Sequence, residues 1–374
     1  GSSSPGPCSS PSLGLTSAIR VAGVYLGAVW VCLSAYALAR RARQDGSWWI
    51  RSRRLFADVV TVSAIAYASA LPFWPLLVDS PVSGPIEALT VFSSFKEVHI
   101  SFFEGEHVRS RDVPRRYAPK WLLLTLPEHI LAALALFLII ALKRRFLSIQ
   151  IAAVILAMAV PLVYAIAMRG VFYDGIRHLI FLIPPMTLIG AIATTEALKH
   201  RESRLRWLAY GVVGLLVFPG IWNVIRLHPN QVVYFNRMIA GGIGKASERY
   251  ATDYWRNSYK QGLDWIDANV EPKEGNLIGL GAGNSNLRWM IDPSRYQIVQ
   301  FQDEADYYIG TTRYDECKLV PGRILHVVKA DETPILYVIQ PDTSYSDDPF
   351  FDSPFRRDFE RAVERLRSQQ NKRR

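Results

Sequence analysis

The sequence predicts an α-helical polytopic membrane protein, with about six transmembrane helices, that carries a small extracytoplasmic α/β domain at its C-terminal end. Two observations lead to this fold class. A helix needs about 20 mostly apolar residues to cross the hydrocarbon core of a bilayer, and apolar stretches of that length recur between Val21 and Ile225. Beyond His228 the chain becomes mostly polar and alternates strand-like with helix-like patterns.

The apolar stretches define a membrane domain over residues 19–228, because they are too many to be core helices of a soluble domain of this size. The connection over residues 80–120 is too long for a simple connector, so we expect an outer loop there. Residues 1–18 are rich in Ser, Pro and Gly, which predicts a disordered tail or the scar of a truncation. The predicted spans are Val21–Leu38, Ala57–Leu77, Trp121–Ala141, Leu147–Ala167, His178–Ala197 and Trp207–Ile225.

Basic residues in the short connections predict which side of the membrane each loop faces. Cytoplasmic loops of membrane proteins carry an excess of Lys and Arg. We therefore expect the three dense connections in the cytoplasm, and the 80–120 loop, the 168–177 turn and the C-terminal domain outside. The dense connections hold Arg40, Arg41, Arg43, Arg51, Arg53 and Arg54, then Lys143, Arg144 and Arg145, then Lys199, Arg201, Arg204 and Arg206.

Residues 229–345 are predicted to form the α/β domain, and residues 346–374 a charged C-terminal helix or tail. One face of that helix would carry Phe355, Phe359, Val363 and Leu366, which favours a solvated terminal helix, with docking on anionic lipid as the alternative. Within the domain the pattern indicates helices at Ser258–Val270 and Asn284–Met290, strands at Asn276–Gly281, Tyr296–Phe301 and Asp306–Gly310, and a hairpin of Arg323–Lys329 with Ile335–Gln340.

Composition and motifs exclude several classes of function. The net charge is +10, but the basic loops of a membrane protein account for it without a nucleic-acid partner. The three cysteines, Cys8, Cys32 and Cys317, form neither a disulfide framework nor a metal site. The run Gly279–Gly283 follows a predicted strand, yet its G-x-G-x-G spacing is not that of a dinucleotide site. We therefore expect no metal and no cofactor.

The segment Arg169–Phe181, RGVFYDGIRHLIF, carries the clearest signal of a site. Asp174, Arg177 and His178 are spaced so that one helix face would hold all three, beside Tyr173 at the outer mouth of the fifth span. Arginine offers a planar fork of donors and keeps its charge, which suits an anionic diester. We predict that Arg177, His178 and Tyr173 bind a lipid phosphate. An Asp–Arg pair that only anchors the end of the span is the alternative.

Other charged residues near the same mouth are further candidates. Arg115, Arg116 and Lys120 would form a basic rim that draws in a phosphate, or would reach toward lipid headgroups. Glu128 and His129 lie inside the third predicted span, where ionisable groups are costly and usually face a cavity or a partner. Contact with headgroups or water is the alternative for both. The predicted cavity-lining residues are Glu128, His129 and Asp174.

A segment rich in Tyr, Trp, Asn and Arg follows the last predicted span. It reads HPNQVVYFN, from His228 to Asn236, and then ERYATDYWRNSYKQ, from Glu248 to Gln261. Aromatic and amide side chains suit a sugar, whose C–H faces stack on rings and whose hydroxyls need donors and acceptors. A structural collar that joins the domain to the helices is the alternative.

Together these segments resemble the C-terminal half of bacterial membrane glycosyltransferases of the family 39 type, relatives of dolichyl-phosphate-mannose–protein mannosyltransferases. The resemblance runs over residues 18–340. It depends on PRRYAPKWLLLTLPE (Pro114–Glu128), on YDGIRHLIFLIPP (Tyr173–Pro185) and on the two aromatic segments that follow.

This resemblance implies a multi-pass enzyme of the bacterial cytoplasmic (inner) membrane. It would move a sugar from a polyprenyl-phosphate carrier to a glycan, lipid or protein acceptor on the outer face, among membrane lipids. The family's catalytic acids lie in an N-terminal outer loop, where one serves as general base, so the chain is expected to be an N-terminally truncated copy without them. A transporter or flippase for a lipid-linked sugar shares the basic outer mouth and is the alternative. A membrane-anchored glycan-binding module is a third possibility.

Overall fold

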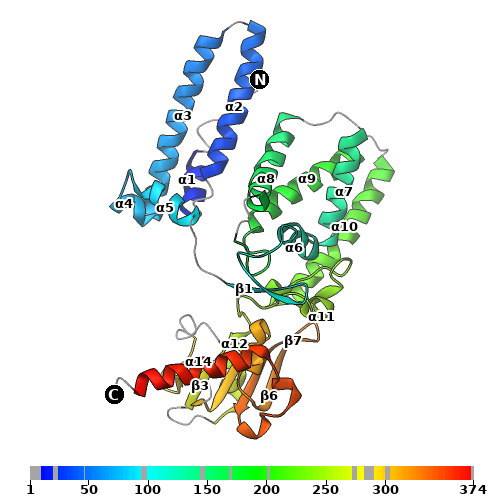
Figure 1. The fold of residues 1–374 in the computed structure, drawn as a ribbon. Coiled ribbons are helices and arrows are strands. Elements are labelled where there is room, and N and C mark those ends of the chain that lie inside the picture. Colours follow the sequence, from blue (N-terminus) through cyan, green and yellow to red (C-terminus); the bar gives the residue numbers. More distant parts are fainter. Residues whose placement is uncertain are drawn as a thin grey trace. The chain divides into compact units, whose positions relative to one another are not determined.

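The protein is mostly helical, with a small sheet in its C-terminal part (Figure 1). It divides into two compact units. The first comprises Gly1–Val98, Leu136–Val171 and Phe181–Thr194, and the second comprises His99–Ala135, Phe172–Ile180 and Thr195–Arg374. The computed structural model describes residues 10–19, 24–45, 47–93, 99–143, 148–167, 171–199, 203–271, 276–281, 290–299 and 304–371.

The first unit begins with three packed helices, α1 (Ser10–Ile19), α2 (Val24–Asp45) and α3 (Trp48–Ala70). Helices α2 and α3 run side by side in opposite directions (Figure 1), and α1 packs against α3. Gly14 permits that contact, since a Cβ there would lie 2.0 Å from the carbonyl oxygen of Ala66. A helix therefore replaces the predicted disordered tail over residues 10–18, and residues 1–9 lie outside the described part. The unit also contains η3 (Leu71–Phe73), α4 (Pro75–Asp79), α5 (Gly84–Ser93), α8 (Ile149–Ala167) and most of α9 (Ile183–Leu198).

Among the described residues, three helical segments are long and apolar enough to cross a membrane: Trp48–Phe73, Ile180–Leu198 and Arg206–Arg226. The pair α6 (Tyr117–Thr125) and α7 (Glu128–Lys143) makes a fourth if it is one bent span. The first and fourth predicted spans form shorter apolar helices, Leu26–Ala39 and Ile149–Tyr164. The structure thus supports three to four candidate spans by length and composition, fewer than the sequence predicts.

The predicted span Trp121–Ala141 is not one straight helix. Helices α6 and α7 meet at a bend of 116°. The bend falls at Leu126, whose φ of −71° and ψ of 134° are extended. Pro127 follows it, and a proline displaces the preceding residue from the helical region. As a result α6 lies buried, with Trp121 only 1% exposed, and it carries Tyr117 and Lys120 into the second unit.

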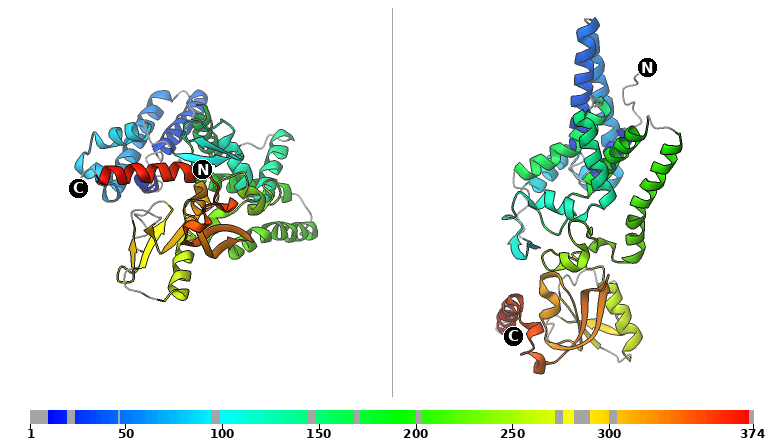
Figure 2. Two further views of the ribbon diagram at one scale, coloured as in Figure 1. Left: turned by 60° about the horizontal axis from the view of Figure 1, so that its bottom comes forward. Right: turned by 90° about the vertical axis from the view of Figure 1, so that its right-hand side faces the viewer.

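The C-terminal part of the second unit is a five-stranded mixed sheet of order β4-β3-β5-β7-β6. Strand β3 pairs in parallel with β4 and β5, and β7 pairs antiparallel with β5 and β6. Helix α12 (Tyr259–Asn269) covers one face and α14 (Pro354–Asn371) covers the other (Figure 2). The strands are β3 (Asn276–Leu280), β4 (Tyr296–Ile298), β5 (Tyr307–Thr311), β6 (Gly322–Ala330) and β7 (Thr333–Pro341).

Most of the predicted elements of this domain are present. The helix at Ser258–Val270, the strands at Asn276–Gly281 and Asp306–Gly310, and the hairpin all have counterparts. Strand β4 is shorter than its prediction, and nearly all of the predicted helix Asn284–Met290 lies outside the described residues. The apolar face of α14 packs on the sheet through Phe355 and Phe359, so these two side chains are not available for docking on lipid.

Before the first helix of the second unit lies a small hairpin from the predicted outer loop. Its strands are β1 (Ile100–Phe103) and β2 (Glu106–Arg109). The tight turn Glu104-Gly105 joins them with positive φ angles of 59° and 88°. Phe103 is buried and its ring packs on those of Tyr117 and Tyr250. The long helix α10 (Ser203–Arg226) completes the unit.

Candidate functional site

The segment that carries Tyr173, Asp174, Arg177 and His178 is a turn, not a helix. Asp174 and Gly175 have positive φ angles of 54° and 67°, and the helical residues begin only at η4 (Ile180–Leu182) and α9. The prediction that one helix face carries the three polar residues is therefore wrong. The turn nevertheless brings Arg177 back onto Asp174, so the Asp–Arg pair expected as the alternative to a phosphate site forms at 2.9 Å.

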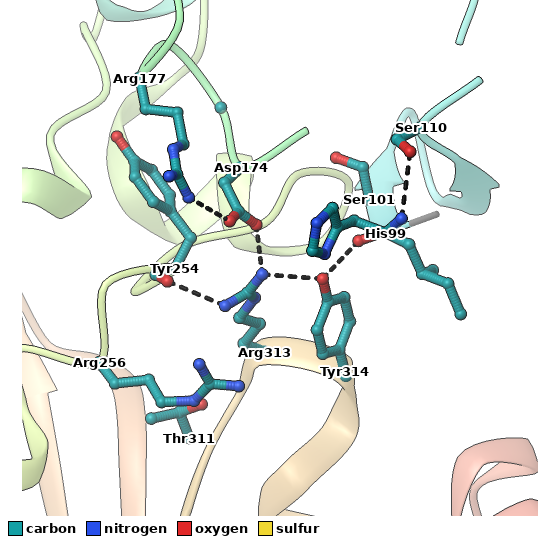
Figure 3. Close-up of polar contacts among 12 residues, drawn as sticks. His99, Ser101, Ser110, Asp174, Arg177, Tyr254, Arg256, Thr311, Arg313 and Tyr314 are labelled. Atoms are coloured by element: carbon teal, nitrogen blue, oxygen red, sulfur yellow. Dashed lines mark hydrogen bonds and ion pairs between the residues drawn. The ribbon is translucent and has the colours of Figure 1, made fainter. Parts of the chain in front are cut away.

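Asp174 is a buried carboxylate that two arginines share (Figure 3). Arg177 Nη1 donates to one oxygen at 2.9 Å, and Arg313 Nη2 donates to the other. Asp174 itself adopts a left-handed backbone conformation that only a few residue types tolerate, and aspartate is one of them. Two guanidinium groups on one carboxylate leave a net positive charge in a part of the unit that is mostly shielded from water.

Arg313 comes from the C-terminal domain, at the start of η7 (Arg313–Lys318) after strand β5. Its side chain is buried, and besides Asp174 it donates to the carbonyl oxygen of Tyr254 at 2.9 Å and to the hydroxyl of Tyr314 at 2.8 Å. The Tyr314 hydroxyl in turn donates to the carbonyl oxygen of Ile100 at 2.5 Å. Arg313 therefore ties the domain, the turn at Asp174 and the β1–β2 hairpin into one network, visible in Figure 3.

The guanidinium of Arg177 contacts two aromatic rings. Its guanidinium carbon is 4.9 Å from the ring centre of Tyr173 and 4.6 Å from that of Trp255. These contacts and the bond to Asp174 fix the guanidinium in position. Its Nε is buried, with no hydrogen-bond partner in the described part of the chain. The Arg177 side chain as a whole is 24% exposed, so the accessible part of its guanidinium, rather than the buried Nε, is the part that an anionic oxygen could contact.

Tyr173 and His178 belong to an aromatic stack beside Arg177. The Tyr173 ring stacks on that of His99 at 4.1 Å, and the His178 ring meets Tyr173 edge-on at 4.6 Å. His178 also lies edge-on to Phe172, at 6.4 Å. The turn therefore brings together all four residues that the sequence grouped there. His178 supports the stack through its ring contacts, while Arg177 supplies the donors.

The predicted basic rim forms a second cluster around Glu104. Arg116 donates to the Glu104 carboxylate at 2.6 and 3.0 Å, and Lys120 pairs with its other oxygen. The hydrogen bonds from Arg116 and Lys120 lower the pKa of Glu104 to about 2. Tyr117, the neighbour of Arg116 in the chain, contacts the turn that carries Asp174: its hydroxyl accepts a hydrogen bond from the Gly175 backbone N–H at 3.2 Å. We call Glu104, Arg116 and Lys120 the rim cluster.

Glu128 and His129 lie at the start of α7, apart from both clusters. Glu128 accepts hydrogen bonds from the backbone N–H of Arg237 at 2.7 Å and from the hydroxyl of Tyr234 at 3.2 Å. The ring of His129 lies against α10, where a Cβ on Gly220 would come within 3.0 Å of it. Both residues make contacts with neighbouring segments of the chain, and their role as cavity-lining residues stays a prediction.

The aromatic segment after α10 is mostly a collar. Tyr250, Tyr254 and Tyr259 are all buried, and burial raises the pKa of Tyr254 to about 12. Asn236 is fully buried and donates to the carbonyl oxygens of Leu123 and Leu126 at 2.6 and 3.0 Å. Carbonyl groups at a helix end lack partners within the helix, so Asn236 stabilises the bend between α6 and α7. Trp255 differs from these neighbours, because it is 51% exposed.

Two residues of the two clusters, Glu104 and Arg313, have no counterpart among the sequence-based candidates, whereas Trp255 is a candidate only as one of many aromatic residues in its segment. Glu104 is recognisable only as part of a turn. Arg313 gives no signal at all, because it is 139 positions from Asp174 along the chain. No group of His, Cys, Asp or Glu within the described residues is arranged to hold a metal ion.

Comparison with known proteins assigns no family to the chain. No protein-family model matches it, and neither the curated proteins nor the solved structures include a significant match. The resemblance to family 39 glycosyltransferases thus stays an expectation from the sequence.

Proposed function

We propose that this protein is a multi-pass membrane glycosyltransferase whose turn at Tyr173–His178 holds the phosphate of a polyprenyl-phosphate sugar. In this proposal Arg177 contacts the phosphate, while Asp174 and Arg313 hold Arg177 in position. The rim cluster attracts the anionic headgroup from the outer membrane surface. A fixed cation near the charge that develops on the leaving phosphate stabilises a transition state in a water-poor site.

The geometry of Arg177 is the observation that carries the proposal. The guanidinium is held by contacts with two rings and one carboxylate, yet the side chain stays 24% exposed and so remains partly open to a ligand. A phosphodiester offers oxygens that match the fork of an arginine. An arginine that only anchored a span end would need neither the second guanidinium on Asp174 nor the contacts with two aromatic rings.

The surface of α10 supports a membrane location. Its apolar segment Arg206–Arg226 has no buried position in its most apolar window. Exposed side chains include Leu215, Phe218 and Trp222. A helix that is apolar all around requires a non-aqueous surrounding, and a bilayer supplies it. The proposed arrangement has six spans with the C-terminal domain outside the cytoplasmic membrane.

Binding of the carrier is the direct test, because no residue of this chain is proposed as the general base. The full chain, in lipid nanodiscs, is titrated with a polyprenyl monophosphate. Arg177→Ala should weaken binding at least tenfold, the factor that corresponds to about 1.4 kcal/mol. Arg295→Ala is the matched control, since Arg295 also pairs with an aspartate, Asp267, and lies over a tyrosine ring. Equal affinities of the Arg177→Ala variant and the unaltered protein would refute the proposal.

A labelling experiment tests the orientation. With Cys8 and Cys32 replaced by Ser, single cysteines are introduced at Met238 and at Arg204, both exposed positions. A membrane-impermeant thiol reagent applied to intact cells should label position 238 and spare position 204. The reverse pattern would place the phosphate turn on the cytoplasmic side and contradict the proposal. Transfer of labelled sugar to an acceptor in membranes separates the enzyme from a flippase, which would move the intact carrier instead.

A further inference from the structure

We infer that the exposed indole of Trp255 is the stacking platform for the pyranose ring of the sugar donor. This inference rests on the proposed function, and it adds the part of the substrate beyond the phosphate. It assigns a sugar contact to a residue whose own segment is otherwise structural. The ligand class is a hexosyl phosphate ester of a polyprenol.

Hydrogen bonds hold the backbone on both sides of Trp255 in place. Trp255 lies in a β-turn closed by a hydrogen bond of 3.0 Å from the Arg256 N–H to the carbonyl oxygen of Asp253. The buried carboxylate of Asp253 accepts from the backbone N–H groups of Asn257 and Ser258 at 2.9 and 3.2 Å. Burial raises the pKa of Asp253, while these bonds stabilise its ionised form. The side chain of Asp253, the first residue of the turn, therefore binds the two residues that follow the turn.

The two residues next to Trp255 are each held by a separate contact. The carbonyl oxygen of Tyr254 accepts from Arg313. Arg256 has a positive φ of 55° and pairs with the buried Glu316 at 2.5 Å. Left-handed backbone at a residue other than glycine costs free energy and persists where surrounding contacts over-determine it, often at functional sites. The chain thus holds its neighbours inward and presents one large side chain outward.

An exposed tryptophan in a well-ordered turn needs a reason, because its apolar area would be stabilised by burial. Trp255 contacts the guanidinium of Arg177 at 4.6 Å. In a hexosyl phosphate a single oxygen joins the sugar ring to phosphorus. A ring whose phosphate contacts Arg177 therefore lies within reach of the side chain that Arg177 itself contacts. The C–H face of a pyranose is apolar enough to cover the indole, and the sugar hydroxyls at its rim remain open to water.

The test compares two ligands, so that it measures the sugar apart from the phosphate. The full chain in nanodiscs is titrated with the methyl ester of a polyprenyl phosphate and with the same carrier bearing one hexose, so that both ligands are singly charged phosphodiesters. The ratio of the two affinities is the contribution of the sugar. We expect the unaltered protein to bind the hexose-bearing carrier about tenfold more tightly, and Trp255→Leu to reduce this ratio to about twofold or less. Leucine keeps apolar bulk beside Arg177 but lacks a flat ring.

Two variants serve as references. Trp222→Leu removes an indole of nearly equal exposure, 52%, from the surface of α10, and should leave the ratio unchanged. Arg177→Ala should weaken binding of both ligands.

Each remaining outcome has one reading. If Trp255→Leu weakens both ligands by the same factor, or neither, Trp255 does not contact the sugar and the inference fails, while the phosphate site stands. If the unaltered protein shows no preference for the hexose-bearing carrier, the inference fails as well. If neither ligand binds the unaltered protein, the proposed function itself fails.

Discussion

Two clusters in the second unit have the same arrangement of charges and differ in how deeply those charges are buried. Each consists of two cations on one carboxylate: Arg177 and Arg313 on Asp174, and Arg116 and Lys120 on Glu104. In the first, the Asp174 and Arg313 side chains are 5% and 8% exposed. In the rim cluster, Arg116 is 65% exposed. The same net charge of one positive unit thus occurs once in the interior and once at the surface.

The difference in burial changes what that charge can do. Exposed ion pairs are screened by water and salt and contribute about 0–1 kcal/mol to stability. Buried pairs have fixed geometry, and the loss of one partner leaves an uncompensated charge in a poor solvent. The rim cluster therefore acts by attraction at a distance, while the Asp174 cluster acts by holding Arg177 in one place. The predictions below begin with changes to the buried cluster, where the expected effects are largest.

Asp174→Asn should have the largest effect on stability. Asparagine tolerates the left-handed backbone of this position, so the change removes charge with little backbone strain. Arg177 and Arg313 then lose their counter-charge, and we expect a loss of about 3 kcal/mol in the free energy of unfolding. Denaturant unfolding of the purified chain in detergent measures it. Asp264→Asn is the control, because Asp264 pairs with Lys260 while 54% exposed. Similar losses in both variants would contradict the comparison.

Arg313→Leu should affect binding more than folding. Asp174 keeps Arg177 as its partner, so the carboxylate is still compensated, but the domain loses its bond to the turn. With one cation fewer, Asp174 competes with the phosphate for Arg177. We expect the affinity for a polyprenyl monophosphate to fall roughly fivefold to tenfold. Arg323→Leu, at an exposed position on β6, should leave the affinity as it is. An unchanged affinity in Arg313→Leu would show that the ion pair between Arg313 and Asp174 has no part in binding.

The sequence predicts the parts of this site that are local. The turn residues Tyr173, Asp174 and Arg177 are neighbours along the chain, and their chemistry indicates an anion site whether they lie on a helix or a turn. The predicted helix was wrong because two successive residues with positive φ, Asp174 and Gly175, interrupt it. Gly175 is also packed tightly, since a Cβ there would approach the Tyr254 ring to 2.9 Å. Tertiary packing of this kind leaves no periodic signal in the sequence.

The long-range parts of the site could not be predicted. The partner of Asp174 in the C-terminal domain, Arg313, is 139 positions away along the chain, and the described part of that interval includes the helices α9, α10, α11 (Gly242–Ser247) and α12 and the strands β3, β4 and β5. Glu104 stands in a hairpin turn, and only the folded chain brings it to Arg116 and Lys120. The same limit applies to the spans. Apolar composition marks Trp121–Ala141 as one stretch, whereas Pro127 divides it into two helices.

Glu104→Gln should have a smaller effect, of opposite sign. The change releases Arg116 and Lys120 from the carboxylate that they share and makes the rim more positive. We expect the affinity for a polyprenyl monophosphate to rise about threefold at low salt, and the gain to vanish at high salt because exposed charges are screened. Titrations at two salt concentrations measure both effects. An equal gain at high salt would mean that the released cations contact the phosphate directly.

The pH dependence of the rim cluster should be the smallest effect of all. The pKa of Glu104 is lowered to about 2 by Arg116 and Lys120, so the carboxylate stays ionised at any pH well above that value. A depressed pKa stabilises the folded state above the ordinary value of 4.5, and this stabilisation is lost only as the pH falls toward about 2. For the methyl ester of a polyprenyl phosphate, a diester whose charge does not change in this range, the affinity difference between the unaltered protein and Glu104→Gln should therefore stay constant from pH 7 to pH 4.5. An ordinary carboxylate would be half protonated at the lower limit, so a difference that shrinks over this range would show that Glu104 is not held by the two cations.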